Sequence, residues 1–262
     1  MDRSAHQRAV TDSSRDWDAA TYDRISAPQQ RWAAEQLDRL KLSGDEVVLD
    51  AGCGSGKITL ELAQRVPRGS VYAVDAAPSM VKHAKQALGE RATVRCQDLT
   101  ELALPEPVDV AFSNATFHWI PDHDALFAAL GRNMKPGARL LAQCGGRGNI
   151  DAFRQTSDAV AAEPPFAPYF ADWRQPWNYA GADETADRLQ RAGFEDVACW
   201  LEDRPTELEE PRSFIATVCL VRHLDPLPEK LRSQFVDAVM ERVGEPLVLG
   251  YVRLNMTARR AP

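Results

Sequence analysis

The feature that most constrains the fold is a glycine-rich run near position 50. Residues 47–50 are apolar up to a terminal Asp50, and glycines then follow at alternate positions, 52, 54 and 56. This order predicts a buried strand, a tight turn and the start of a helix, as at the first strand of an open α/β sheet. Glycine lacks a Cβ atom, so the backbone of such a turn can approach a ligand closely. We therefore expect a ligand across the carboxyl end of this strand.

Two common glycine loops fit this spacing poorly. A phosphate-binding P-loop requires Gly-x-x-x-x-Gly-Lys followed by Ser or Thr, but Ala51 stands at its first glycine and Ile58 follows Lys57. The dinucleotide fingerprint requires Gly-x-Gly-x-x-Gly, and Lys57 occupies its third glycine position. The spacing disfavours ATP or GTP hydrolysis and argues less strongly against an NAD oxidoreductase.

Further segments follow in a definite order. Residues 71–75 form a second apolar run ending in an acid, after the separation expected for one βαβ unit. Pro78-Ser79-Met80-Val81 predicts a helix start, Cys96-Gln97-Asp98-Leu99 ends a third strand, and residues 108–115 supply a fourth strand with the segment after it. Together with the glycine turn, these segments resemble the motifs of the class I S-adenosylmethionine-dependent methyltransferases.

The resemblance implies S-adenosylmethionine as the cofactor and S-adenosylhomocysteine as the product. It implies that Asp75 accepts hydrogen bonds from both ribose hydroxyls, that Met80 lies against the adenine, and that Asp98 binds the adenine amino group. The residues expected to contact the cofactor are Tyr22, Asp50, Ala51, Gly52, Cys53, Gly54, Asp75, Ala76, Met80, Asp98, Leu99, Asn114 and Ala115.

Each of these assignments has a purely structural alternative. Asp50 and Asp75 could cap the helices that follow them, because Asp often accepts hydrogen bonds from backbone N–H groups there. Met80 could fill core space, as methionine on an apolar helix face usually does. Asp98 could only form a turn before Leu99.

The segment after the fourth strand, residues 114–123, resembles that of the trans-aconitate methyltransferases and the malonyl-carrier-protein methyltransferases, a likeness that covers most of the chain from Trp17. Methyl transfer mainly requires the acceptor to be aligned and water excluded. His118 is the candidate catalytic residue: it could hydrogen-bond a substrate carboxylate, remove a proton, or order its loop. Trp119 could donate an indole N–H or form a wall. Relatives of the trans-aconitate type often carry Gln at the position of His118.

Substrate binding is expected from Tyr22, His118, Trp119, Tyr251 and Arg253. A guanidinium among apolar neighbours favours bidentate pairing with a carboxylate, although a surface salt bridge is the more frequent role of an arginine. The expected reaction is O-methylation of a carboxylic acid. The alternatives are N- or C-methylation of an aromatic or isoprenoid metabolite, and an enzyme that binds the sulfonium cofactor without transferring its methyl group.

The resemblance and the alternation of apolar runs predict an α/β fold, a Rossmann-like seven-stranded mixed sheet with an N-terminal helical lid and an inserted cap after the fifth strand. We expect a disordered tail at 1–14 and one domain at 15–262, divided into a lid (15–44), a cofactor-binding core (45–145), and the cap with the C-terminal strands (146–262). Residues 148–180 are rich in large rings and prolines, which predicts a long loop that packs on the core, covers the substrate, or both. The strands are expected at 47–50, 71–75, 93–96, 108–113, 140–144, 197–201 and 247–259, with Lys135-Pro136-Gly137-Ala138 as the turn before the fifth, and the later helices at 182–192, 211–223 and 228–243.

Composition narrows the partners. The net charge of −7 disfavours nucleic acid, so the expected partner is a small-molecule substrate, and the sequence does not predict the oligomeric state. The chain shows no leader and no apolar stretch of the length that spans a bilayer, so we expect a cytoplasmic protein without a membrane association. The five cysteines are dispersed and form no Cys-x-x-Cys pair, which predicts neither a metal site nor disulfides.

Overall fold

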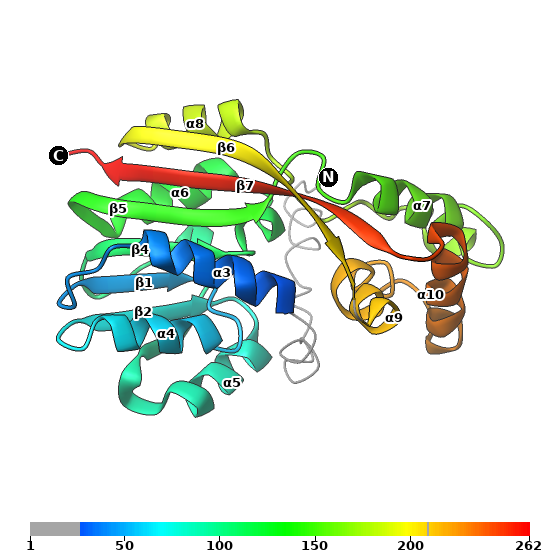
Figure 1. Cartoon of the computed structure of the whole chain (residues 1–262), viewed down its shortest axis with the longest axis horizontal. Helices are drawn as coiled ribbons and strands as arrows, with labels where there is room; N and C mark the ends of the chain where they lie inside the picture. Colours follow the sequence, from blue (N-terminus) through cyan, green and yellow to red (C-terminus); the bar gives the residue numbers. More distant parts are fainter. Residues whose placement is uncertain (1–26, 209) are drawn as a thin grey trace, which may run out of the picture.

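A computed structural model describes residues 27–208 and 210–262. Its centre is a seven-stranded mixed sheet in the order β3-β2-β1-β4-β5-β7-β6, in which β7 runs antiparallel to both of its neighbours (Figure 1). This arrangement confirms the predicted Rossmann-like fold. The strands are β1 (Val47–Ala51), β2 (Ser70–Asp75), β3 (Thr93–Cys96), β4 (Val108–Asn114), β5 (Met134–Gly145), β6 (Phe194–Glu207) and β7 (Val248–Arg260).

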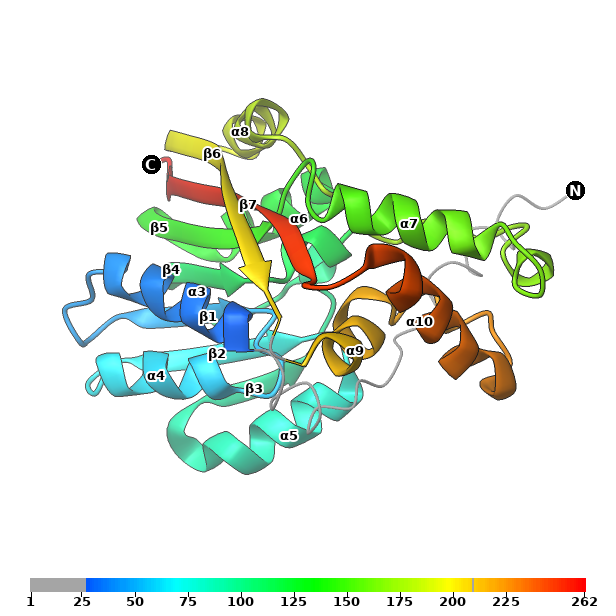
Figure 2. The ribbon, with the colours of Figure 1, turned by 45° about the vertical axis from the view of Figure 1, so that its right-hand side comes forward.

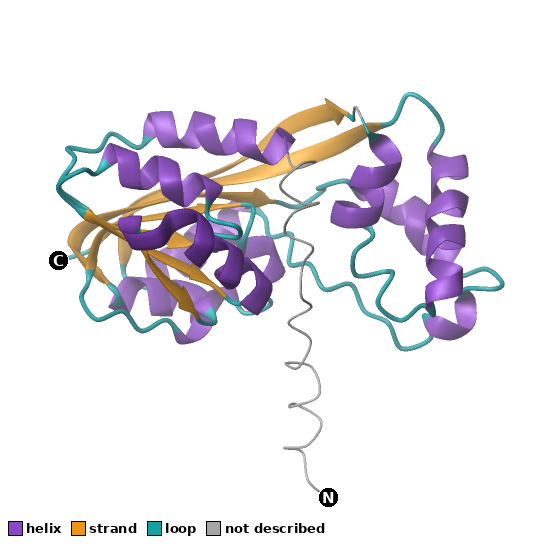
Figure 3. Ribbon diagram, turned by 90° about the horizontal axis from the view of Figure 1, so that it is seen from below, coloured by secondary structure: helices purple, strands orange, loops and turns teal. Residues whose placement is uncertain are grey.

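Helices cover both faces of the sheet, as Figure 3 shows from below. Side chains alternate between the faces along each strand, so Val48 joins the core under α3 and α4 while Leu49 joins the core under α6 and α8. The helices are α3 (Ala27–Arg39), α4 (Lys57–Arg65), α5 (Pro78–Leu88), α6 (His123–Arg132), α7 (Asp151–Ala161), α8 (Ala182–Arg191), α9 (Pro211–Phe214) and α10 (Glu229–Val243), with short turns η1 (Gly89–Arg91), η2 (Leu99–Glu101), η3 (Phe117–Trp119), η4 (Ala167–Tyr169) and the π-helical turn η5 (Ile215–Cys219).

Helix α3 is the part of the expected lid that the structure describes. It has Pro28 in its first turn, and Leu37 and Leu40 are buried in the core on the sheet. Trp32, near its start, instead belongs to the core of the cap. The helix therefore joins the sheet to the cap. The predicted tail at 1–14 and the first part of the predicted lid, residues 15–26, lie outside the described residues.

The cap has a core of its own beyond the carboxyl ends of the parallel strands (Figure 2). Helices α7, α9 and α10 pack there around Phe235, whose ring lies 5.1 Å from that of Phe166 and 5.5 Å from that of Phe170. The prediction of one long loop at 148–180 was wrong in its first part, where α7 forms. Phe153 and Val160, seven residues apart, lie on one buried face of that helix.

Several element boundaries also differ from the predictions. Strand β5 begins at Met134 because that residue already pairs with Val108, and the predicted turn around Gly137 is an irregularity within the β4–β5 pairing. Strand β6 is much longer than predicted, since it pairs with β7 as far as Glu207. The helix predicted at 211–223 is instead the single turn α9 followed by η5, whereas α10 begins within a residue of its predicted start.

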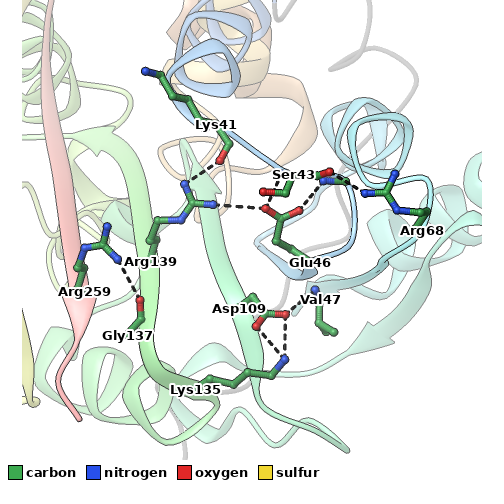
Figure 4. Close-up of polar contacts among 11 residues, drawn as sticks. Lys41, Ser43, Glu46, Val47, Arg68, Asp109, Lys135, Gly137, Arg139 and Arg259 are labelled. Atoms are coloured by element: carbon green, nitrogen blue, oxygen red, sulfur yellow. Dashed lines mark hydrogen bonds and ion pairs between the residues drawn. The ribbon is translucent and has the colours of Figure 1, made fainter.

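The amino ends of the strands are held by polar contacts at the edge opposite the cap (Figure 4). The Asp109 carboxylate accepts hydrogen bonds from the backbone N–H of Val47 (2.8 Å) and from Lys135 Nζ (2.8 and 2.9 Å), which links β1, β4 and β5. Burial raises the pKa of Asp109, but these hydrogen bonds outweigh it and the pKa is lowered. Glu46 similarly accepts the N–H groups of the Ser43–Gly44 turn.

Candidate functional site

The glycine turn folds back on the end of β2. The backbone N–H groups of Gly52 and Cys53 both donate to the carbonyl of Val74, at 2.8 and 3.0 Å. Gly52 has a φ of 87°, and a Cβ atom there would lie 2.1 Å from Thr116 Oγ1. The Thr116 hydroxyl in turn donates to the carbonyl of Gly52 at 3.2 Å. The turn is thus fixed against the segment that follows β4, and only glycine fits at this contact.

Asp50 lies beneath the turn and is 2% exposed. Its Oδ2 accepts a hydrogen bond from Thr59 Oγ1 at 2.6 Å. Burial raises its pKa to about 7, the hydrogen bond from Thr59 partly counters that shift, and the nearby Asp75 adds to it. Its contact with α4, which begins at Lys57, is to the Thr59 side chain, and Gly56 stands at the N-cap position of that helix.

Asp75, at the end of β2, closes the turn from the other side. Its Oδ2 accepts the Gly54 N–H and its Oδ1 accepts the Ala77 N–H, both at 2.9 Å. A carboxylate oxygen has two lone pairs, so each Asp75 oxygen can still accept one hydrogen bond from a hydroxyl of a ligand. Burial raises the pKa of Asp75, and these backbone hydrogen bonds lower it in part. Ala77 is the N-cap residue of α5, so Asp75 accepts a backbone N–H at the start of that helix, as the structural alternative predicts.

The residues expected near an adenine follow the carboxyl ends of β2 and β3 in the chain. The Gln97 N–H donates to the carbonyl of Asp75 at 3.0 Å, which holds the segment after β3 against the end of β2. Met80 is buried on α5 and Leu99 is buried in η2. Asp98 is exposed, and its Oδ1 accepts hydrogen bonds from both the N–H and the hydroxyl of Thr100 at 2.8 Å. The turn-forming role of Asp98 is thus present in the structure.

The segment after β4 begins with a constrained backbone. Ala115 has a φ of 57°, and its N–H donates to the Gln143 carbonyl on β5 at 2.7 Å. This kink directs the chain into η3, which carries His118 and Trp119. Next comes α6, which begins at His123 and is capped by Asp122.

A cavity opens between this segment, β7 and the cap. Four of the five residues predicted to bind substrate line it, namely His118, Trp119, Tyr251 and Arg253, whereas Tyr22 lies outside the described residues. Its other described lining residues are Ala115, Asn149, Ile150, Trp177, Tyr179, Val218 and Cys219.

His118 is held as a neutral hydrogen-bond donor. The Gly145 N–H donates to its Nδ1 at 3.3 Å, and since a neutral imidazole carries one proton, that proton is assigned to Nε2. Burial lowers its pKa to about 3, with Arg253 and His123 contributing repulsion. His118 can therefore donate from Nε2, but neither nitrogen is available as a base.

Arg253 is only 2% exposed, so it does not form the surface salt bridge considered as an alternative. Its Nε donates to Gln143 Oε1 at 3.3 Å, and its Cζ lies 4.6 Å from the centroid of the Trp32 ring. The Gln143 amide is fixed in turn, because its Nε2 donates to Asn255 Oδ1 at 2.8 Å. The guanidinium is thus oriented by the linked side-chain amides of Gln143 and Asn255 and, on one face, by the indole ring of Trp32.

The opposite part of the cavity wall is aromatic. The Trp177 and Tyr179 rings are almost parallel, with 2° between their planes and 6.2 Å between centroids. Tyr179 also stacks on His118, at 5.7 Å, and Trp119 lies 5.8 Å from Trp177. A Cβ atom at Gly145 would lie 2.6 Å from Tyr179 Cε1, so glycine there allows the wall to sit against β5.

Sequence reasoning missed several residues of the site. Thr116 lies within the segment 114–123, but no sequence pattern predicts its contact with Gly52. Gln143 and Asn149 come from the end of β5 and the loop after it, and Val218 and Cys219 from η5. Trp177 and Tyr179 were noted only as members of a ring-rich segment. Among the residues described, no group of three possible ligands forms a metal site, and no helix is long and apolar enough to cross a membrane.

Comparison with known proteins identifies the family. Residues 48–137 match a family described as a methyltransferase domain. A trans-aconitate 2-methyltransferase of Methylobacterium nodulans is 30% identical over 94% of this chain and 98% of its own length. The chain belongs to the trans-aconitate methyltransferase group of the class I S-adenosylmethionine-dependent methyltransferases.

Solved structures agree with this methyltransferase in fold. The YcgJ protein of Bacillus subtilis superposes with a TM-score of 0.62 at 14% identity, over 89% of this chain and 99% of its own. A Haemonchus contortus phosphoethanolamine N-methyltransferase, solved with S-adenosylhomocysteine and phosphomonomethylethanolamine, has a TM-score of 0.61 at 17% identity. That match covers 93% of this methyltransferase and 57% of the longer nematode protein. Because the chain belongs to this family, its cofactor is S-adenosylmethionine.

Proposed function

We propose that this methyltransferase methylates a carboxylate oxygen of a small organic acid. The observation that carries the proposal is Arg253, a buried guanidinium held in a fixed orientation at the wall of the cavity. A planar guanidinium matches a carboxylate in geometry and charge. The named substrate of the trans-aconitate relatives is an acid of this class.

The state of His118 supports the same class of acceptor. A carboxylic acid is already ionised at neutral pH, so its oxygen is a nucleophile without a base, whereas a hydroxyl or an ammonium group must first lose a proton. His118 is a donor at Nε2 and has a pKa of about 3, so it is unsuited to remove that proton. We assign it to bind a carboxylate oxygen beside Arg253, while Trp119 and Tyr251 enclose the acceptor.

The cofactor site is proposed to be the glycine turn and the strand ends around it. S-adenosylmethionine supplies an electrophilic methyl group there. The bare backbone of Gly52–Gly54 and the Asp75 carboxylate fit a nucleoside with an amino-acid tail. Ala115 lines the acceptor cavity, and we assign it and the preceding Asn114 to the part of the cofactor next to the acceptor. Asp50, Ala51, Cys53 and Ala76 complete the turn, and Met80, Asp98 and Leu99 are assigned to the adenine side.

The test is an assay of the full chain with S-adenosylmethionine and a panel of carboxylic acids, amines and phenols. The expected result is release of S-adenosylhomocysteine together with a methyl ester, both detected by mass spectrometry. Methylation confined to amines, phenols or carbon would overturn the proposal. Cofactor binding with no turnover on any acceptor would instead support an enzyme that does not transfer the methyl group.

A further inference from the structure

We infer that the acceptor is a monocarboxylic acid with a planar, unsaturated body, of the arylacrylic or aromatic type, and not a tricarboxylate. The inference rests on the proposed function and specifies its substrate class. The inferred acceptor differs from the substrate for which the relatives are named, because trans-aconitate carries three carboxylates. Two independent properties of the cavity support it, its charge and its aromatic wall.

The first property is charge. Among the described residues that line the cavity, Arg253 alone is charged, and the other polar groups are the neutral side chains of His118, Asn149, Trp119, Trp177, Tyr179, Tyr251 and Cys219. One carboxylate can pair with Arg253. A second and a third would be buried against rings and neutral groups, where an ion without a counter-charge is strongly disfavoured.

The other two arginines close to the ring wall do not supply the missing charge. Arg154 lies against the Tyr179 ring, with 5.2 Å between Cζ and the centroid, and forms a 2.8 Å salt bridge with Asp151. Arg222 lies against Trp119 at 5.9 Å and pairs with Asp225 at 3.5 Å. Neither belongs to the lining of the cavity.

The second property is the aromatic wall. Trp119, Trp177 and Tyr179 all line the cavity, and a planar conjugated body can pack against such rings face-on or edge-on, whereas a branched, hydrated tricarboxylate gains little from them. Trp177 is supported from behind by the buried His223, 5.8 Å away, which itself packs on Trp173 at 4.4 Å. The wall is therefore formed before the substrate arrives, and binding does not have to order it.

His118 joins the two parts of the cavity. Its ring stacks on Tyr179 in the aromatic wall, and it is near enough to Arg253 for the two to interact electrostatically. A carboxylate bound by Arg253 and His118 thus adjoins the rings directly. This placement suits an acid in which the carboxyl group is attached to the planar body without a long spacer.

The test compares trans-cinnamate, crotonate and trans-aconitate as acceptors for the wild-type enzyme, with methyl esters measured by mass spectrometry. We expect kcat/KM for trans-cinnamate to exceed that for trans-aconitate by about tenfold or more. A preference for trans-aconitate would overturn this inference and leave carboxylate methylation intact. No ester from any acid, with turnover on amines or phenols, would overturn both.

A pair of variants separates the wall from general stability. Trp177→Leu should lower kcat/KM for trans-cinnamate about tenfold, through KM, and that for crotonate less than about threefold, because crotonate has no ring to stack. Trp200→Leu is the matched control, since Trp200 lies on β6, is 36% exposed and does not line the cavity, and it should change kcat/KM for neither acid. If Trp177→Leu lowered kcat/KM equally for trans-cinnamate and crotonate, the role of the wall would be contradicted. If that variant does not fold, the comparison of the three acids with the wild-type enzyme still tests the inference.

Discussion

The Arg253 guanidinium lies over the indole ring of Trp32, with 4.6 Å between Cζ and the ring centroid. Trp32 also contacts Tyr251 edge-on, with 5.0 Å between ring centroids. The start of α3 thus packs against two cavity residues of β7 that are 2 residues apart in sequence. A cation–π contact orients a guanidinium through the face of its plane and does not itself use the N–H donors at the edge.

Removing the charge of Arg253 should weaken acceptor binding selectively. In Arg253→Gln we expect KM for the acid to rise about 10- to 100-fold, because a charge-assisted hydrogen bond contributes about 1.5–3 kcal/mol. The Kd of S-adenosylmethionine, measured by calorimetry, should stay within about twofold. Arg259→Gln, on the same strand but half-exposed and far from the cavity, is the control. An unchanged KM in Arg253→Gln would remove the main support for a carboxylate acceptor.

His118→Gln distinguishes a donor from a base. A glutamine amide can still donate a hydrogen bond, so kcat should fall by less than about tenfold, whereas loss of a general base lowers the rate by about 10²–10⁴. The wild-type kcat should also show no inflection near pH 6.5, since the pKa of His118 is about 3. A steep decrease in kcat in the variant, or such an inflection, would identify His118 as a base.

The same residue predicts acid sensitivity of the fold. Burial lowers the pKa of His118 from 6.5 to about 3, so below pH 6.5 the unfolded chain binds a proton that the folded protein excludes. The contribution of neutral His118 to the free energy of unfolding is fully present above pH 6.5 and decreases as the pH falls toward 3. At pH 5 the free energy of unfolding should have lost about 2 kcal/mol from this source. Urea unfolding of wild type and His118→Gln at pH 7.5 and 5 measures the difference. The variant should lose less stability than the wild type on acidification, and equal losses would contradict the prediction.

Gly52→Ala should disrupt the cofactor turn. An alanine there must adopt a φ of 87° with its Cβ 2.1 Å from Thr116 Oγ1, so the turn has to move. We expect the Kd of S-adenosylmethionine to rise more than about tenfold and stability to fall by about 1–3 kcal/mol. Gly89→Ala is the matched control, because Gly89 also has a positive φ, of 54°, but has open space around it. If both variants bind the cofactor equally well, the turn does not require glycine for binding.

Asp109→Asn tests the opposite edge of the sheet. The variant loses the ion pair with Lys135 and weakens the hydrogen bond from the Val47 N–H, and we expect a destabilisation of about 1 kcal/mol. Steady-state kinetics should not change, because the contact lies at the amino ends of the strands. Asp196→Asn, an exposed residue 3.7 Å from Arg259, should leave both stability and kinetics unchanged. Altered kinetics in Asp109→Asn would show that the two edges are coupled.

The parts of the molecule that local sequence dictates were predicted well. The glycine turn, Asp75 and the five parallel strands of the cofactor half follow from short-range rules, namely apolar runs, turn residues and the spacing of a βαβ unit. The mixed character of the seven-stranded sheet came from the family resemblance and is confirmed by the antiparallel pairing of β7. The α7 helix was missed because its buried face alternates with charged residues in a segment dominated by prolines and rings.

The cavity was predicted only in part because its residues meet through tertiary structure. His118, Trp177 and Arg253 come from three distant segments, and no local pattern specifies that they share a wall. The protonation of His118 depends on a backbone N–H donated by Gly145, 27 residues away. The aromatic wall depends on that same glycine, whose missing Cβ admits Tyr179.

Strand β7 starts among the cap helices and ends as an interior member of the sheet, so one continuous stretch carries Tyr251, Arg253 and Asn255. In a chimera that carries the cap of a relative, the position of the second junction therefore decides which protein supplies Arg253. Exchanging residues 147–249 would keep Arg253 together with Gln143 and Asn255, the amides that orient it. A junction beyond Arg253 would take the arginine from one protein and Gln143 from the other. Specificity for the acceptor body and affinity for its carboxylate can thus be engineered separately.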